Sequence, residues 1–328
     1  MPHRGPENTG EERRKGPGPT GGRGGFRKRR DRLRICRPRP QYRVDRHGKE
    51  GTPHKEVPIV ENNLSDQLKE TFSEEEMHQN WIRVYRNPLS AAFYERAFDR
   101  ICSLLNPPRE AGILDVGCGT CAQSMRLARR GFQVLAVDFS ETALKKAETE
   151  IRSAGLQDRI TLRREDILSL TLGDGSFEYL LCWGVLMHIA DLERAISELI
   201  RVCKPGGRII ISEGNMSSLQ SRILRGLKKA FRLGKSRVVR GKEGYEFWES
   251  TSSGVLLTRQ ADIRWLVRRF KEGGCSLEHR FAGQFTELYS VFHSTPAAWS
   301  IHKLNDLYFR HLMWPLPAFG NICIFRKE

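Results

Sequence analysis

Short runs rich in apolar residues alternate along this chain with segments whose apolar residues recur every three or four positions. The runs that predict buried strands cover residues 113–116, 133–138, 159–162, 177–183 and 208–212. The segments that predict helices cover residues 123–130, 140–154 and 191–202, and Ser140 is suited to cap the second of them. Strands that alternate with helices in this way predict a parallel sheet covered on both faces.

A glycine turn directly follows the first of these strands. Residues 113–116 lead into Gly117-Cys118-Gly119, where two residues without a Cβ let the chain turn sharply and a ligand approach the backbone. The next strand ends at Asp138, about 20 residues later, where a carboxylate commonly binds a ribose diol. Strand, helix, strand and acid in this order predict a nucleotide-like cofactor.

The identity of that cofactor depends on the residues around the glycines. Gly117, Gly119 and Ala122 also fit a dinucleotide fingerprint, so a nicotinamide or flavin enzyme is an alternative. Asp115 favours S-adenosylmethionine, because a carboxylate at this place would repel a pyrophosphate and attract an ammonium or sulfonium group. Cys118 and Cys121 form a C-x-x-C pair without a second pair elsewhere, and we expect no metal site.

Charge is distributed unevenly along the chain. The formal net charge is +16, and residues 1–60, with 17 Lys+Arg and 7 Asp+Glu, supply +10 of it. This segment is rich in Arg, Gly and Pro, so we expect it to be a disordered basic tail that precedes a domain at residues 61–328. Such a tail is either a solvated extension or an arm that binds a polyanion; its acidic residues weaken a transit-peptide interpretation.

The sequence also bears on the cellular compartment. It contains no run of about 18 apolar residues that could span a bilayer, and its start lacks the apolar core of a secretory signal. The eight cysteines lack the regular spacing of a disulfide framework. We therefore expect a cytoplasmic protein in a reducing compartment.

Five motifs in a characteristic order carry a resemblance to a known family. They lie at residues 114–120, 137–138, 165–167, 185–189 and 202–207. With them, from about residue 80 onward, the chain resembles the class I S-adenosylmethionine-dependent methyltransferases, in particular the small-molecule branch (methyltransferase domain 11/25-like). The resemblance implies a seven-stranded, mostly parallel Rossmann-like sheet closed by an antiparallel C-terminal hairpin, for which residues 276–283 and 321–325 supply strands. Cys121, in place of a third glycine, and Glu178, in place of a frequent Asp, depart from the family pattern.

The same resemblance assigns cofactor contacts. It implies that Gly117 and Gly119 contact the methionine part of S-adenosylmethionine and that Asp138 binds the ribose hydroxyls. Asp166 would accept the adenine amine, with Phe139 and Ile167 flanking the ring. The position of Asp166 and Ile167 after a strand suits this role, although a solvated acid in a turn explains Asp166 equally well when it is considered alone. The other residues that we expect at the cofactor are Asp115, Cys118, Cys182 and Trp183.

Methyl transfer from a sulfonium is an in-line displacement that needs alignment of the acceptor, exclusion of water and removal of a proton where required. His188 follows the fourth strand at the mouth of the predicted site, and its ordinary pKa lies near neutrality. It is the candidate to accept a proton or orient the acceptor. A histidine that only packs or hydrogen-bonds a loop explains the same position.

Segments outside the sheet are expected to select the acceptor. Residues 61–108 predict N-terminal helices broken at Asn87-Pro88, and residues 215–260 an inserted lid with a basic amphipathic helix that suits an anionic membrane or an anionic acceptor. Aromatic residues beyond position 247 are candidates for the wall of an acceptor pocket, although core packing explains most of them: Trp248, Trp265, Trp299, His302, Tyr308, His311 and Trp314.

The leading prediction is therefore a methyltransferase that acts on O, N or C of a small or lipid-like metabolite. An acceptor such as RNA or protein, held by the basic tail, is the alternative. A nicotinamide-dependent oxidoreductase and a non-catalytic binding module are further alternatives, although a complete set of cofactor-binding residues argues against the second. No nucleic-acid base-methylating motif follows the fourth strand, and the sequence leaves the oligomeric state open.

Overall fold

A computed structural model describes residues 64–75, 88–231, 237–251, 254–290 and 295–328. All described residues belong to the unit that spans residues 56–328. The predicted tail at residues 1–60 and the residue Asn87 at the predicted helix break lie outside the described residues.

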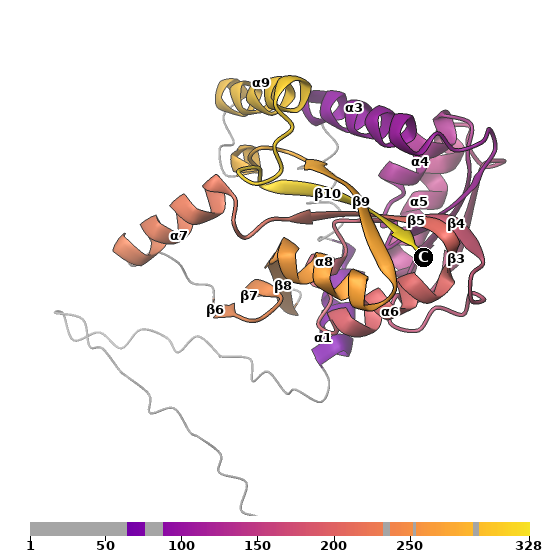
Figure 1. Ribbon diagram of the computed structural model, residues 1–328, viewed down its shortest axis with the longest axis horizontal. Helices are drawn as coiled ribbons and strands as arrows, with labels where there is room; N and C mark the ends of the chain where they lie inside the picture. The colour runs from indigo at the N-terminus through magenta and orange to yellow at the C-terminus, as the bar shows by residue number, and fades with distance from the viewer. Residues whose placement is uncertain (1–63, 76–87, 232–236, 252–253, 291–294) are drawn as a thin grey trace, which may run out of the picture. The chain divides into compact units, whose positions relative to one another are not determined.

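The described residues contain a seven-stranded sheet in the order β3-β2-β1-β4-β5-β10-β9 (Figure 1). Its first five strands run parallel, while β10 pairs antiparallel with both β5 and β9. The strands are β1 (Gly112–Val116), β2 (Gln133–Asp138), β3 (Ile160–Arg164), β4 (Phe177–Trp183), β5 (Cys203–Gly214), β9 (Cys275–Ala282) and β10 (Gly320–Lys327). This arrangement confirms the predicted fold class, including the antiparallel closure.

Helices cover both faces of this sheet, because its strands alternate buried side chains between two cores. In β10, Ile322 and Ile324 face one core and Cys323 and Phe325 the other. The first core packs the sheet on α3 (Pro88–Leu105), α4 (Ala122–Arg129), α5 (Glu141–Ser153) and α9 (Thr295–His311). The second packs it on α6 (Leu192–Val202) and α8 (Ile263–Glu272). The sheet is therefore doubly wound, as the sequence predicted.

Individual helices begin where local chemistry favours a cap. Ser140 precedes α5, and its hydroxyl accepts a hydrogen bond from the backbone N–H of Ala143 at 3.2 Å, which confirms it as the N-cap. Asp191 and Asp262 cap α6 and α8 in the same way. The chain directions that these caps set bring each crossover helix back onto the sheet.

The insertion after β5 contains more than the helix that the sequence predicted. Besides α7 (Leu219–Phe231), it forms a second, antiparallel sheet of three strands in the described residues: β6 (Arg237–Arg240), β7 (Gly244–Thr251) and β8 (Gly254–Ala261). Alternate residues of β8 are buried, and one of these inward positions holds Arg259. The sequence did not predict this sheet, because a charged residue at an inward position masks the alternation.

An N-terminal helix packs on that second sheet. Helix α1 (Leu64–Ser73) buries Leu68 and Phe72 against Leu257 of β8. Two segments about 190 residues apart in the chain therefore form one wall beside the central sheet. Among the described residues, no helix is long and apolar enough to cross a membrane.

Candidate functional site

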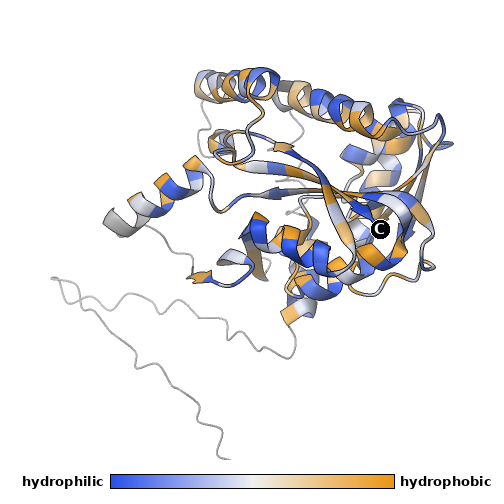
Figure 2. Cartoon of the chain, in the orientation of Figure 1, coloured by the Kyte–Doolittle hydropathy of each residue, from blue (hydrophilic) through white to orange (hydrophobic). Residues whose placement is uncertain are grey.

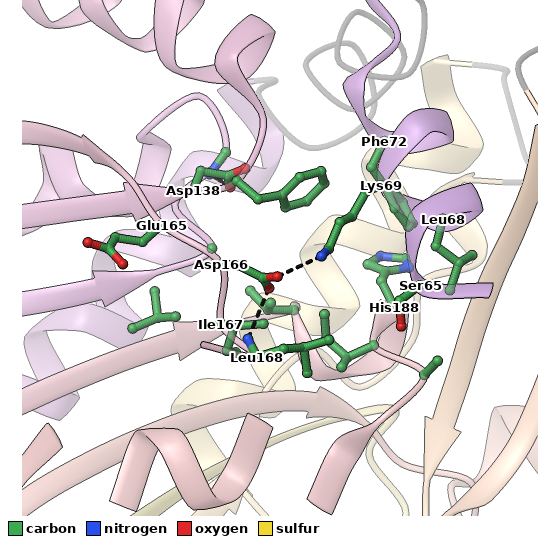
Figure 3. Close-up of a pocket in the computed structure, with 18 residues that line it drawn as sticks. Ser65, Leu68, Lys69, Phe72, Asp138, Glu165, Asp166, Ile167, Leu168 and His188 are labelled. Carbon is green, nitrogen blue, oxygen red and sulfur yellow. Dashed lines mark hydrogen bonds and ion pairs between the residues drawn. The ribbon is translucent and has the colours of Figure 1, made fainter. Parts of the chain in front are cut away.

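A pocket opens where the parallel strands β1, β2, β3 and β4 end, the edge at which doubly wound sheets bind ligands. The cavity measures about 110 Å³ and is mostly apolar. It is closed on one side by α1, as Figure 3 shows. Its lining residues are Ser65, Leu68, Lys69, Phe72, Val116, Gly117, Gly119, Asp138, Phe139, Glu165, Asp166, Ile167, Leu168, Gly184, Val185, His188, Ile189 and Ala190.

The glycine turn and Asp138 form one hydrogen-bonded unit. The N–H of Gly119 donates to Asp138 Oδ2 at 2.8 Å, and the N–H of Ser140 donates to Oδ1 at 2.9 Å. Burial raises the pKa of Asp138, although these N–H donors oppose the shift. The Asp138 carboxylate thus holds the glycine turn and still lines the pocket. Its remaining lone pairs can accept hydrogen bonds from the hydroxyl groups of a ligand.

Gly117 is a position in the glycine turn where a side chain is poorly tolerated. It has a φ of 73°, and an added Cβ would lie 2.5 Å from Cγ2 of Val185. We expect Gly117→Ala to lower the free energy of unfolding by about 1–3 kcal/mol, because the substitution adds a clash to backbone strain. Denaturant unfolding checks this.

Gly119→Ala is the matched control, since Gly119 has a φ of 54° but no atom within 4 Å of an added Cβ. It should cost only the strain, about 1 kcal/mol. Equal losses in the two variants would contradict the steric argument.

Asp166 lines the same pocket as Asp138 and pairs with a lysine that the sequence analysis did not single out. Lys69 Nζ of α1 lies 2.6 Å from Asp166 Oδ2, while Asp166 Oδ1 accepts the N–H of Leu168 at 3.0 Å (Figure 3). Both side chains are about one-third exposed or less. Lys69 was missed because it reaches this site across 97 positions of the chain. An adenine amine at Asp166 would have to share or displace this ion pair.

His188 lies on the opposite wall in η2 (Leu186–His188), the short 3₁₀ turn that follows β4. Its Nδ1 is 2.7 Å from the carbonyl oxygen of Leu257, and its ring centroid lies 4.8 Å from that of Phe72. A carbonyl oxygen only accepts, so Nδ1 carries the proton and Nε2 the lone pair. Desolvation lowers the pKa of His188 to about 4. His188 is therefore neutral over the physiological range.

Two buried charged residues hold the turn that carries His188. At its start, Glu213 Oε1 accepts the N–H of Leu186 at 2.9 Å; burial raises the pKa of Glu213 to about 8. At its end, Arg259 of β8 donates to the carbonyl oxygens of Leu186 at 3.2 Å and Ile189 at 2.7 Å. The Arg259 side chain is 2% exposed and pairs with Glu246 at 2.7 Å. The inserted sheet thus positions one wall of the pocket.

Four of the predicted cofactor residues do not line this pocket. Asp115 is buried behind the glycine turn, where it accepts the Ser124 hydroxyl at 2.5 Å and where burial raises its pKa to about 7. Trp183 stacks on Phe98 of α3. Cys118 and Cys182 are buried in the two cores of the sheet. The predicted residues that the pocket does bring together are Gly117, Gly119, Asp138, Phe139, Asp166, Ile167 and His188.

The C-x-x-C pair has the character of core thiols. Cys118 and Cys121 are both free and buried. Burial raises the pKa of the Cys118 thiol, and neighbouring Cys121 raises it further. Redox and metal chemistry both require the thiolate, which this environment disfavours.

The aromatic residues near the C-terminus do not form a common pocket wall. Trp299 and Trp314 are 50% and 64% exposed, and His311 is also exposed. His302 and Tyr308 are buried, stacked on Tyr289 and Phe285. Trp248 and Trp265 pack against other core clusters. Core packing, which the sequence analysis gave as the explanation for most of these residues, accounts for Trp248, Trp265, His302 and Tyr308.

Comparisons with known proteins agree with this geometry. Residues 114–211 match the family model described as "Methyltransferase domain". The chain is 32% identical over 128 residues to methyltransferase GfsG of Streptomyces halstedii, covering 39% of this chain and 46% of the relative. It is 38% identical over 103 residues to demethylmenaquinone methyltransferase of Desulfitobacterium hafniense, covering 30% and 40%. The chain thus spans less than half the length of these two relatives.

A solved structure extends the likeness to the fold. The magnesium protoporphyrin IX methyltransferase of Synechocystis, which was crystallised with bound S-adenosylhomocysteine, superimposes with a TM-score of 0.55 and 15% identity. The match covers 80% of this chain and all of the other. Together, these findings show that residues 114–211 match a methyltransferase domain and that the sheet order, with a pocket at its carboxyl edge, belongs to a fold shared with a solved methyltransferase.

Proposed function

We propose that this protein transfers a methyl group from S-adenosylmethionine to a small or lipid-like acceptor. The observation that carries the proposal is the pocket itself, which is lined by Asp138, Asp166, apolar residues and a glycine turn. A nucleoside offers hydroxyls, an amine and a flat ring, which these groups match.

The residues present fit this cofactor. Gly119 lines the cavity with no atom within 4 Å of an added Cβ, so the backbone there is open to a ligand, and Asp138 is a buried carboxylate that lines the same cavity. We assign Asp138 to the ribose, Asp166 to the adenine amine, and Phe139 with Ile167 to the ring faces. When bound, S-adenosylmethionine supplies the electrophilic methyl group; the protein aligns the acceptor and excludes water.

The relatives' names support a small acceptor, since one is a demethylmenaquinone methyltransferase. Neither the family model nor these relatives favour RNA, protein or a nicotinamide reaction. We further propose a cytoplasmic location, which the free thiols of every described cysteine support. Residues 1–60, which are basic, are proposed to contact a polyanion peripherally; deleting them should leave turnover of a small acceptor unchanged.

Calorimetric titration with S-adenosylmethionine, S-adenosylhomocysteine and NAD tests the cofactor directly. We expect micromolar binding of the first two and no heat from NAD. Binding of NAD alone would overturn the proposal.

Asp138→Ala should weaken S-adenosylmethionine binding about 10-fold or more, since charge-assisted hydrogen bonds contribute about 1.5–3 kcal/mol. The same titration measures the effect, and thermal unfolding shows whether loss of the Gly119 and Ser140 contacts also costs stability. Asp158→Ala, at an exposed acid outside the pocket, is the control. Unchanged affinity in the Asp138 variant would place the ribose elsewhere.

A further inference from the structure

Large apolar side chains that stay exposed gather on a few elements of the described structure. Apart from Leu277 of β9, those recorded lie on α7, β6, α9 and the segment directly after α9. The side chains that matter most here are Leu219, Ile223, Leu227, Leu307, Trp314 and Leu316, which are 45% to 64% exposed. A soluble surface seldom concentrates apolar residues of this size without a partner.

Hydrogen bonds join these elements into one surface. The N–H of Leu219, the first residue of α7, donates to the carbonyl of Pro317 at 3.0 Å. Asn215 Nδ2 donates to the carbonyl of Leu316 at 3.0 Å, and the Tyr308 hydroxyl of α9 donates to the carbonyl of Trp314 at 2.7 Å. In Figure 1, α7 lies to the left of the central sheet and α9 above it, and β3 lies at the right. We call α7, α9 and residues 312–316 the apolar–basic surface.

The charged residues of this surface are predominantly cations. In α7, Arg222 is exposed, whereas Arg225 donates to the carbonyl of Met216 at 2.6 Å and lies over the ring of Tyr245; the helix contains no acidic residue. In α9, Lys303 Nζ lies 5.5 Å from the ring centroid of Trp299, and the single acid, Asp306, pairs with Arg310 at 3.0 Å. Residues 312–316 carry no charge. Figure 2 shows the resulting mixture of hydrophobic and hydrophilic residues along both helices.

This combination distinguishes a lipid partner from a protein partner. The centre of a protein–protein interface is poor in lysine, whereas helices that lie in a membrane interface combine apolar residues with Lys and Arg and place Trp at the headgroup level. Anionic headgroups would complement the cations while the apolar side chains enter the acyl boundary. We propose that the apolar–basic surface binds the surface of membranes that contain anionic lipids. The inference does not depend on the identity of the methyl acceptor.

Vesicle co-sedimentation of the full chain tests this proposal. The probe is phosphatidylcholine vesicles with and without phosphatidylglycerol, at low and high salt. We expect binding only to the anionic vesicles, weakened by salt. The double variant Ile223→Asp with Leu316→Asp should bind the anionic vesicles at least about 10-fold more weakly. It replaces apolar side chains that would enter the acyl boundary with carboxylates that the anionic headgroups repel.

Controls separate this surface from the rest of the basic chain. Leu277→Asp introduces an acid at the exposed leucine of β9, outside the surface, and should bind as the unaltered protein does. Trp314→Ser, which changes no charge, should also weaken binding. Unaltered binding by the Asp and Ser variants would assign the affinity to residues 1–60 and overturn the proposal. A second result would also overturn the proposal. If the Asp and Ser variants still bind vesicles but sedimentation velocity shows that they turn a dimer into a monomer, the surface joins two copies of the chain.

Discussion

Replacing Arg259 by leucine is expected to lower the free energy of unfolding by about 3–5 kcal/mol, the usual cost of breaking a buried ion pair from one side. Arg259 is 1% exposed, and its guanidinium pairs with Glu246 and donates to the carbonyl oxygens of Leu186 and Ile189. Leucine would leave these acceptors without a donor in a place that water reaches poorly. Urea unfolding measures the loss.

Arg152→Leu is the control for this prediction. Arg152 forms an ion pair with Glu148 on the surface of α5, where its side chain is 72% exposed. Exposed pairs of this kind contribute about 0–1 kcal/mol. A loss of similar size in both variants would show that Arg259 does not act as a buried anchor. Because the turn at His188 would also relax, the Arg259 variant should lose methyl-transfer rate at temperatures where it remains folded.

We propose that His188 accepts a proton during methyl transfer, so His188→Asn is expected to reduce kcat about 100-fold, the lower end of what general-base catalysis contributes. An asparagine amide can replace the Nδ1–H donor to the Leu257 carbonyl, but it offers no counterpart of the Nε2 lone pair. The variant therefore removes the proton acceptor while it keeps the loop contact. Steady-state kinetics with saturating acceptor measures the change.

The pH dependence gives this residue a second, independent test. Desolvation places the pKa of folded His188 at about 4, below its ordinary value of 6.5. The rate should then show no His188 inflection near pH 6.5 and should fall only as pH approaches 4. Since the unfolded chain binds this proton first, His188 also costs stability as pH falls from 6.5 to 4, and the Asn variant should be spared that loss. A kcat within about 3-fold of the unaltered enzyme would reduce His188 to a structural residue.

A large part of the fold could be predicted from local patterns. The strands ending at Val116, Asp138 and Trp183 are short apolar runs between helical segments. Glycines mark the turn that follows the first of these strands. Strands and helices can be told apart because the periodicities of their apolar residues differ. Since crossover connections between parallel strands are almost always right-handed, only a few topologies are compatible with such a pattern. The same patterns placed Gly117, Gly119, Asp138, Asp166 and His188 at the carboxyl edge of the sheet, where the structure has them.

Other site features depend on contacts between distant segments. Lys69 meets Asp166 across 97 positions, and Arg259 reaches the turn at Leu186 across 73. No spacing rule in one sequence reports such pairs, because they arise only when α1 and the inserted sheet pack beside the central sheet.

Tertiary packing also decides which strand-end residues face the ligand. Asp115 and Trp183 lie at the predicted edge, but Asp115 turns to Ser124 and Trp183 to Phe98. The sequence by itself determined the order of strands and helices and the edge at which the site lies, since these follow from local periodicity and turn chemistry. Only the tertiary structure decided which side chains enter the pocket and which stay exposed, because a side chain's surroundings depend on neighbours far away in the chain.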